Sequence, residues 1–338
     1  MEIILPCAGA SSRFPNMRPK YLLSDYANRM MVENAAKNYI GKYRVTIVIL
    51  KEHDEKYNAR KKLVEVFGHK VDIIVLDKIT EGPADTVAQA ILRGRISNDS
   101  PILVKDCDGF YDTQVVEGNV IYVAKLSKHP KIRTAAAKSY TITNEQGIIN
   151  TVVEKQIVSN SFCVGGYQFE SAREYIDAFQ EIKKNKTSEI FVSNVIDYMI
   201  SKGTMFFESE VENFIDVGVA EDWFEYNNKP SYFCDIDGTI VENSNEYETY
   251  TPLYDNVAKL KSEFERGCQI IFCTARPWKY ESVTRKMLQN LGFDDYHLVM
   301  GIHHAKRILI NDFASSNPYP SAIAVNLVRD SDNLGDMI

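Results

Sequence analysis

Short apolar runs alternate with amphipathic helical patterns along much of this chain, and this alternation restricts its possible folds more than any other feature. Buried strands are predicted at residues 2–6, 44–50, 71–76 and 101–108, and helices at residues 29–40, 55–68 and 85–95. Strands that are apolar throughout are typical of sheets covered on both faces. The first part of the chain is therefore predicted to form an α/β fold around a mostly parallel, Rossmann-like sheet.

The pattern changes after residue 119 to consecutive strands, which predicts an antiparallel insertion into the same sheet. These strands are expected at residues 120–126, 134–143, 148–155 and 162–169, and after two helical stretches at 205–209 and 213–219. A polar segment with a proline, residues 226–231, then precedes a second alternating series. A chain of 338 residues also exceeds the usual size of one core. We therefore expect two domains, residues 1–228 and 229–338.

Composition excludes several classes of function. The net charge is −7, and no dense stripe of Lys and Arg with interleaved aromatic residues is present, which argues against a nucleic-acid partner. The first residues, MEIILPCAG, are not expected to act as a signal peptide, and no apolar run approaches membrane-spanning length. The six cysteines include no Cys-x-x-Cys pair. We interpret them as reduced thiols in a cytoplasmic protein, and we leave its oligomeric state open.

The stretch YFCDIDGTIVEN, residues 232–243, opens the second domain with a strand that leads into two carboxylates. Asp235 and Asp237 are two residues apart, so they are expected to point to the same side at the end of the strand. Oxygen ligands of this kind suit Mg²⁺. One carboxylate can attack phosphorus, and the other can protonate the leaving oxygen. Gly238 permits the tight turn that follows.

Two later stretches complete this pattern. CQIIFCTARP is an apolar strand that ends in Thr274, followed by Ala275 and Arg276, and HHAKRILINDFA supplies Lys306 before a predicted strand that ends in Asn311 and Asp312. Together these motifs resemble the haloacid dehalogenase superfamily of phosphohydrolases. The short intervals between the motifs indicate a Rossmann-like domain without a large cap.

This resemblance implies Asp235 as nucleophile and Asp237 as general acid/base. Phosphate binding would fall to Thr274, Ala275, Arg276 and Lys306, and Mg²⁺ binding to Asp235, Asp237 and Asp312. The family often has two acids in its last motif, whereas the first of these positions is Asn311 here. A domain that binds or oligomerises without catalysis therefore stays an alternative.

In the first domain, the stretch LPCAGASSRFPNMRPKYLL, residues 5–23, places a loop of small residues directly after the first strand. Small residues let backbone N–H groups approach an anion closely, Arg13 can clamp phosphate oxygens, and Lys20 adds a point charge. The loop is neither a Walker loop nor a dinucleotide fingerprint. It resembles the signature of the sugar-phosphate nucleotidyltransferases, in which Gly-x-x-x-Arg is followed by Pro-Lys.

Three more stretches resemble the same family, in order: TEGPADTVAQA, ILVKDCDGFYD and FIDVGVAEDW. The resemblance implies catalytic roles for Arg13 and Lys20 and a Mg²⁺ held by Asp108 and Asp216, so that each domain would use one Mg²⁺. Acceptor contacts would come from Glu154, Lys155 and Gly166. Nucleotide contacts are expected from Leu5, Ala8, Gly9, Ala10, Ser11, Arg13, Lys20, Gly82, Pro83, Ala84 and Asp106.

The expected chemistry is attack by the phosphate of a phosphorylated sugar or polyol on the α-phosphorus of a nucleoside triphosphate, with release of pyrophosphate. The brief base loop favours CTP or UTP. With a phosphatase in the second domain, the chain would be a bifunctional enzyme that supplies an activated precursor for capsule or cell-surface glycan. A glycosyltransferase of the GT-A type fused to a phosphatase is a further alternative, because KDCD also matches its Asp-x-Asp motif. The two activities could also act on different metabolites.

Overall fold

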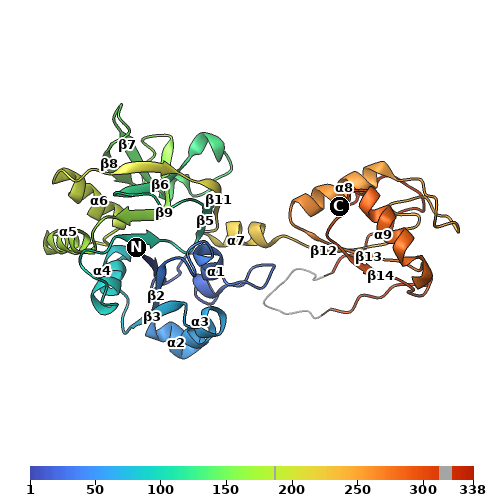
Figure 1. The fold of residues 1–338 in the computed structure, drawn as a ribbon, viewed down its shortest axis with the longest axis horizontal. Coiled ribbons are helices and arrows are strands. Elements are labelled where there is room, and N and C mark those ends of the chain that lie inside the picture. The colour runs from blue at the N-terminus through green and yellow to red at the C-terminus, as the bar shows by residue number, and fades with distance from the viewer. Residues whose placement is uncertain (186–187, 312–321) are drawn as a thin grey trace. The chain divides into compact units, whose positions relative to one another are not determined.

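The computed structural model describes residues 1–185, 188–311 and 322–338, and it divides the chain into two units, Met1–Asn227 and Asn228–Ile338 (Figure 1). Unit 1 is built on one large sheet and a separate two-stranded ribbon. The strands of the unit are β1 (Glu2–Pro6), β2 (Arg44–Leu50), β3 (Val71–Leu76), β4 (Ile102–Lys105), β5 (Gly109–Asp112), β6 (Val120–Lys125), β7 (Ser139–Thr143), β8 (Ile149–Glu154), β9 (Ser161–Phe169), β10 (Phe207–Glu210) and β11 (Glu212–Asp216).

The helices of unit 1 follow the strands in the alternating order that the sequence indicates. They are α1 (Met31–Ala36), α2 (Lys51–Tyr57), α3 (Ala59–Phe67), α4 (Pro83–Arg93), α5 (Ala172–Asn185), α6 (Val192–Ser201) and α7 (Ala220–Asn227), with the short 3₁₀ turns η1 (Lys20–Leu22), η2 (Leu126–Lys128) and η3 (Ala135–Ala137).

The strand order of the main sheet is β10-β6-β9-β4-β1-β2-β3. Strands β4, β1, β2 and β3 are parallel, while β9 runs antiparallel to both β4 and β6. β7 and β8 form a hairpin, and β7 pairs with β9 through Tyr140 and Phe162. β5 pairs with β11 in a separate ribbon. This arrangement confirms the predicted α/β class with a central, mostly parallel sheet.

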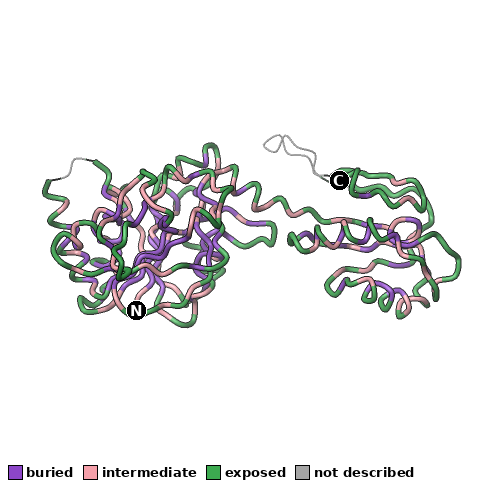
Figure 2. The backbone as a smooth tube through the Cα atoms, turned by 90° about the horizontal axis from the view of Figure 1, so that it is seen from above, coloured by how far each residue is buried: buried purple, intermediate pink, exposed green. Residues whose placement is uncertain are grey.

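Two cores cover the two faces of this sheet. Figure 2 shows the buried residues of unit 1 in purple in its interior. Ile3 and Leu5 of β1 pack into the core on the side of α1 and α3, whereas Ile4 packs into the core on the side of α4, α5 and α6. Successive strand residues point to opposite faces, so a strand that is apolar throughout feeds both cores. This double burial explains why β1 carries no polar alternation.

Unit 2 has a smaller parallel sheet in the order β12-β13-β14, with β12 (Ser231–Cys234), β13 (Gln269–Cys273) and β14 (His297–Val299). Its helices are α8 (Tyr254–Glu265) and α9 (Glu281–Asn290), with η4 (Trp278–Tyr280) and η5 (Leu334–Asp336). A separate core of residues such as Ile236, Leu260 and Phe272 holds these elements together.

Three local predictions were wrong. The helix predicted at residues 55–68 is two helices, because Asn58 between α2 and α3 adopts the left-handed conformation (φ 53°) that Asn tolerates better than most residues. The strand predicted at 134–143 begins only at Ser139, since η3 occupies its first part. The strand predicted before Asn311 is not formed over its described residues, where Ile308 and Ile310 are exposed instead of paired with a neighbouring strand.

All six cysteines carry free thiols. Across the described parts of the chain, no helix combines the length and apolar character needed to cross a membrane.

Candidate functional site

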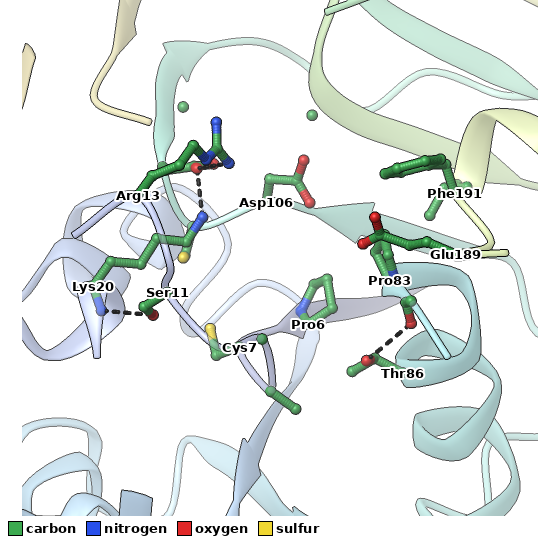
Figure 3. Close-up of a pocket in the computed structure, with 18 of the residues that line it drawn as sticks. Pro6, Cys7, Ser11, Arg13, Lys20, Pro83, Thr86, Asp106, Glu189 and Phe191 are labelled. Carbon is green, nitrogen blue, oxygen red and sulfur yellow. Dashed lines mark hydrogen bonds and ion pairs between the residues drawn. The ribbon is translucent and has the colours of Figure 1, made fainter. Parts of the chain in front are cut away.

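A cavity of about 760 Å³ opens in unit 1 where β1 and β4 end. These two strands are parallel neighbours, with Ile4 opposite Val104, so the loops that follow them meet at one edge of the sheet. Figure 3 shows the side chains that surround the cavity. The lining comes from residues 6–14, 79–83, 106–109, 137–139 and 163–165, with further contributions that include Lys20, Thr86, Glu154, Lys155, Glu189 and Phe191.

The loop after β1 presents Gly9, Ala10 and Arg13 as exposed residues at the cavity. Its shape is fixed by Ser11, which has a φ of 52° and whose Oγ accepts a hydrogen bond from the backbone N–H of Lys20 at 3.1 Å. This bond ties the small-residue loop to the Pro-Lys segment, so Arg13 and Lys20 lie on the same side of the cavity (Figure 3). The two cations are therefore positioned to act on one ligand.

Asp108 is the anionic partner of both cations. Lys20 Nζ lies 2.5 Å and Arg13 Nη2 3.5 Å from Asp108 Oδ2. Burial opposes ionisation of this carboxyl, but the charges of Lys20 and Arg13 outweigh it and hold the pKa of Asp108 well below its usual range. The pKa of Lys20 is raised for the same reason, because Asp108 outweighs the effect of burial. Both groups are charged at neutral pH.

Asp106 has a different environment two residues earlier. Burial, together with the negative charge of Asp108, raises the pKa of Asp106 to about 6. The backbone N–H of Asp106 donates to Gly165 O at 2.7 Å, and a Cβ on Gly165 would lie only 2.5 Å from Asp106 Oδ2. Gly165, with a φ of 77°, therefore allows the Asp106 carboxylate to turn into the cavity.

Asp108 and Asp216 come together across the β5–β11 ribbon. Asp216 pairs with Gly109 in the register, and Val217 N–H donates to Asp108 O at 2.9 Å. A Cβ on Gly218 would lie 3.1 Å from Asp216 Oδ1 and 3.3 Å from Asp108 Oδ2, so both carboxylates border the same small space.

Among the residues that the structure describes, no three His, Cys, Asp or Glu side chains cluster as metal ligands. Mg²⁺ is commonly held by only one or two carboxylates, with phosphates and water completing its six ligands. Asp108 and Asp216 are two carboxylates that could hold such an ion, and in this structure they are paired with Lys20 and Lys138.

The opposite wall of the cavity is the turn that precedes α4. Gly82 has a φ of 138°, and a Cβ there would lie 2.6 Å from Ile190 O, so only glycine fits. Thr80 Oγ1 and Thr86 Oγ1 are 2.6 Å apart and close the turn, while Pro83 occupies the first position of α4. This turn lies across the cavity from Arg13 (Figure 3).

Glu154 sits at the end of β8 with one carboxylate oxygen fixed by two hydroxyl groups. Ser139 Oγ and Ser193 Oγ donate to Glu154 Oε2 at 2.5 and 2.6 Å. Lys155 follows with a φ of 56°, and its Nζ lies 4.3 Å from the centre of the Phe191 ring. This end of the cavity therefore offers carboxylate and ammonium groups that are already oriented.

The structure brings most of the residues predicted in unit 1 to this cavity, but four of them, Leu5, Ala84, Gly166 and Asp216, are not among its lining residues. Asp216 lies next to the lining residue Asp108, whereas the other three are packed into the surrounding structure. Leu5 and Ala84 are fully buried in the two cores. Gly166 faces Tyr111 and Tyr122, where a Cβ would lie 2.1 Å from Tyr111 Oη. These residues shape the surrounding structure through packing.

Sequence reasoning missed four residues that contact the predicted set: Thr134, Lys138, Ser139 and Ser193. Lys138 Nζ lies 2.7 Å and Thr134 Oγ1 2.5 Å from Asp216 Oδ2. No motif marks these positions, because Thr134 and Lys138 reach Asp216 from a distant segment of the chain, 82 residues earlier in the case of Thr134. Ser139 of β7 and Ser193 of α6 contact Glu154, and only the fold brings these elements together.

In unit 2, the predicted residues lie at the ends of β12 and β13. Asp237 accepts hydrogen bonds on both oxygens from Arg276, with distances of 2.6 to 3.1 Å, and Arg276 is 2% exposed. Thr274 Oγ1 lies 3.4 Å from Asp237 Oδ2. Arg276 thus binds Asp237 directly, whereas the sequence suggested that it binds phosphate.

Asp235 is partnered by Arg307, whose Nη2 lies 2.9 Å from Asp235 Oδ1, while the predicted Lys306 is exposed next to it. Asp312 lies outside the described residues. The described residues of unit 2 therefore include two of its three predicted magnesium ligands, Asp235 and Asp237, and both are paired with arginine.

Comparison with known proteins supports the fold of unit 1. No family model and no curated protein sequence matches the chain. Among solved structures, it is similar to the nucleoside-diphosphate-sugar pyrophosphorylase from Vibrio cholerae RC9, with a TM-score of 0.56, 19% identity, and coverage of 66% of this chain and 98% of that one.

Two further solved structures are similar to this chain over about the same share of its length. The inositol-1-phosphate CTP transferase from T. maritima has a TM-score of 0.51 and 15% identity over 65% of this chain and 90% of that one. A putative glucose-1-phosphate thymidylyltransferase from Bacillus anthracis, solved with sucrose, has a TM-score of 0.52 and 18% identity over 67% and 93%. At these identities, the likeness establishes a shared α/β fold.

Proposed function

We propose that unit 1 transfers a nucleotidyl group from a nucleoside triphosphate to a phosphorylated small molecule and releases pyrophosphate. The observation that carries this proposal is the single cavity in which Arg13 and Lys20 face Asp108 on one side and the Gly82 turn forms the opposite wall. The solved structures that share the fold include an NDP-sugar pyrophosphorylase, a CTP transferase and a putative thymidylyltransferase.

In this mechanism, the exposed N–H groups around Gly9 and Ala10 and the guanidinium of Arg13 bind the two phosphates that leave as pyrophosphate. Lys20 bridges the reacting phosphates and neutralises charge that develops on them. The narrow turn at Gly82 and Pro83 accepts the base, with CTP or UTP favoured by its small size. Mg²⁺ held by Asp108 and Asp216 would supply further neutralisation of the phosphate charges.

The acceptor lies at the opposite end, between Glu154 and Lys155. Glu154 Oε2 is saturated by two serine hydroxyls, so Oε1 is the oxygen that can accept a hydroxyl of a sugar or polyol. The acceptor's own phosphate then attacks the α-phosphorus in line with the departing pyrophosphate.

Arg13→Ala tests this function against glycosyl transfer. A glycosyltransferase meets only a diphosphate that stays attached to its nucleoside, whereas a nucleotidyltransferase must hold the leaving pyrophosphate. We expect the variant to bind triphosphate at least about tenfold more weakly, because a charge-assisted hydrogen-bond pair is lost, with a much smaller effect on the nucleotide-sugar product. Calorimetric titration with both ligands measures the difference. Equal loss for both ligands would favour the glycosyltransferase.

We further propose that unit 2 hydrolyses a phosphate monoester, with Asp235 as nucleophile and Asp237 as general acid/base. The two carboxylates follow β12, at the carboxyl edge of a parallel sheet, where Arg307 contacts Asp235 and Arg276 fixes Asp237. An economical sequence would remove one phosphate from a bisphosphorylated sugar and then nucleotidylate the remaining one. The product would serve as a precursor for capsule or other surface glycan.

Asp235→Asn tests the covalent mechanism. The amide is close in size to the carboxylate but lacks the negative charge of the nucleophile, so phosphatase turnover should be lost and nucleotidyl transfer should be retained. Hydrolysis of a chromogenic phosphate monoester measures phosphatase turnover, and pyrophosphate release measures nucleotidyl transfer. Phosphatase activity within about tenfold of wild type would exclude Asp235 as nucleophile. Wild-type protein without phosphatase activity would favour a non-catalytic unit.

A further inference from the structure

Two cysteines, Cys7 and Cys107, line the cavity of unit 1 but have no role in the mechanism above. Cys7 directly follows β1, and Cys107 lies between Asp106 and Asp108 after β4. Each has 4% of its surface exposed, and both carry free thiols. Because both residues border the cavity, a small solute that enters it can approach the pair.

The main sheet brings these two cysteines together. β1 and β4 are parallel neighbours with Ile4 opposite Val104, and each cysteine is three residues further along its own segment. Both belong to the core on the side of α1 and α3, so their side chains leave the sheet on the same face. Neighbouring strands lie about 4.8 Å apart, which is within the Cα–Cα range of disulfides, about 4.4 to 6.8 Å.

The two side chains are also in contact. The thiol of Cys7 donates a hydrogen bond to Cys107, and this bond is the largest of the causes that raise the pKa of Cys7. Cys163, a third cysteine at the cavity, has different surroundings, because its pKa is raised by burial and by the charges of Glu154 and Glu208. Cys7 and Cys107 therefore form a pair to which Cys163 does not belong.

We propose that Cys7 and Cys107 are a site of reversible oxidation, at which hydrogen peroxide converts the two thiols into a disulfide. The sulfur of one cysteine attacks the peroxide, the O–O bond breaks, and the thiol proton leaves with the hydroxide as water, which gives a sulfenic acid. The second sulfur attacks the first, the S–O bond breaks, and another water leaves as the S–S bond forms. A thiol reductant restores both thiols by exchange.

The position of the pair connects this oxidation with the cations of the cavity. Cys107 directly precedes Asp108, whose Oδ2 lies 2.5 Å from Lys20 Nζ, and Cys107 is among the groups that raise the pKa of Lys20. Figure 3 shows Cys7 on the same side of the cavity as Lys20. The S–S bond of about 2.05 Å is shorter than any contact between two separate thiols, so oxidation must draw the two segments together.

This movement should weaken the binding of a triphosphate. We expect a loss of about tenfold or more in affinity, because a displacement of about 1 Å in a preorganised site can cost about 100-fold. The effect on binding rests on the proposed nucleotidyl transfer, whereas formation of the disulfide does not.

The experiment uses the full chain, treated with hydrogen peroxide, alkylated at its remaining thiols and digested with trypsin. Cleavage after Arg13, Lys105 and Lys125 gives the peptides 1–13 and 106–125, each of which contains a single cysteine. Mass spectrometry of the digest before and after reduction identifies the linked pair. Calorimetric titration with CTP and UTP, of the reduced and the oxidised protein, measures the change in affinity.

Two variants complete the comparison. Cys7→Ser cannot form the bond, so it should lose much less affinity in peroxide, relative to its own reduced form, than the wild type does. Cys163→Ser is the matched control, because it removes a buried cysteine of the same cavity and keeps the pair. The peptide analysis of the wild-type chain needs neither variant, so it decides the proposal even if a substitution prevents folding.

A link between peptides 1–13 and 106–125 in the wild type and in Cys163→Ser, formed in peroxide and lost on reduction, supports the proposal. Cys7 and Cys107 that stay reduced, or that pair with other cysteines, overturn it. Formation of the link without weaker triphosphate binding overturns the proposed effect on the cations. Reduced protein that binds neither triphosphate counts against the proposed function, and the peptide analysis still decides the oxidation site.

Discussion

Asp106 and Asp108, which follow β4 two residues apart, have carboxyl pKa values that are shifted in opposite directions. Asp108 is paired with Lys20 and Arg13, which keep its pKa low, whereas Asp106 lacks such close cations and has its pKa raised to about 6 by burial and by Asp108. A carboxylate that stays charged in a buried position suits a cation. This contrast favours Asp108 over Asp106 as a ligand of the proposed Mg²⁺.

If Asp108 and Asp216 share a catalytic Mg²⁺, Asp108→Asn and Asp216→Asn should each reduce nucleotidyl transfer on the order of 10²-fold or more, as loss of electrostatic stabilisation does. The amide keeps the size of the side chain and removes its charge. Initial rates of pyrophosphate release at saturating Mg²⁺ measure the effect.

Circular dichroism of both variants provides the control, because Asp108→Asn also leaves Lys20 without its partner. Phosphatase activity should persist in both variants. Folded variants that transfer nucleotide at the wild-type rate would rule out the metal assignment.

At the scale of elements, α2 contributes a titratable group to unit 1. His53 is the buried residue of this helix, and its Nδ1 lies 3.4 Å from Tyr21 Oη, so α2 packs on η1 next to Lys20. Burial lowers the pKa of His53, although Glu52 opposes the shift. The unfolded chain therefore takes up a proton near the ordinary pKa, and the folded chain does so only at lower pH.

Stability should consequently be lost as the pH falls below about 6.5 toward the lowered pKa, and His53→Gln should reduce that loss. Urea unfolding of wild type and His53→Gln at about pH 7.5 and about pH 5.5 measures this loss of stability. A Trp278→Phe background leaves Trp223, which is buried in unit 1, as the fluorescent probe. A midpoint difference between the two pH values that is equal in wild type and variant would contradict this prediction.

The elements that sequence predicts best are those with a continuous apolar run, such as β1 and β2, because burial on both faces leaves a clear pattern. The break at Asn58 and the 3₁₀ turn η3 depend on single backbone conformations that periodicity does not detect. The apolar run before Asn311 has the composition of a strand, but a strand also needs a neighbour to pair with, and its described residues have none in the sheet. Pairing is a property of the tertiary structure.

The residues of the candidate site also fall into those that the sequence predicts and those that only the fold reveals. Arg13 and Lys20 were predictable because they lie in one short segment, in which small residues precede the arginine and a proline directly precedes the lysine. Lys138 and Thr134 were not, since only the fold brings them to Asp216. The sequence predicts that Arg276 lies near the phosphate site of unit 2. It does not show that this side chain is buried against Asp237, because that depends on the three-dimensional placement of both side chains.

At the scale of the whole molecule, the chain consists of two units, each with its own sheet and core. Separate cores would allow the two proposed activities to share a chain without sharing a core. Joining two sites in one chain raises the effective concentration of an intermediate that passes between them. The central claim nevertheless concerns unit 1 alone, because its cavity carries the charges that a triphosphate and a phosphorylated acceptor require.

The most direct test of this claim is pyrophosphate release by the wild-type chain, with the common nucleoside triphosphates each combined with a panel of phosphorylated sugars and polyols. The account predicts that one triphosphate, CTP or UTP, releases pyrophosphate in step with formation of a nucleoside-diphosphate product, and that added pyrophosphate reverses the reaction. Absence of pyrophosphate release from every combination, together with sugar transfer from a nucleotide-sugar, would contradict it.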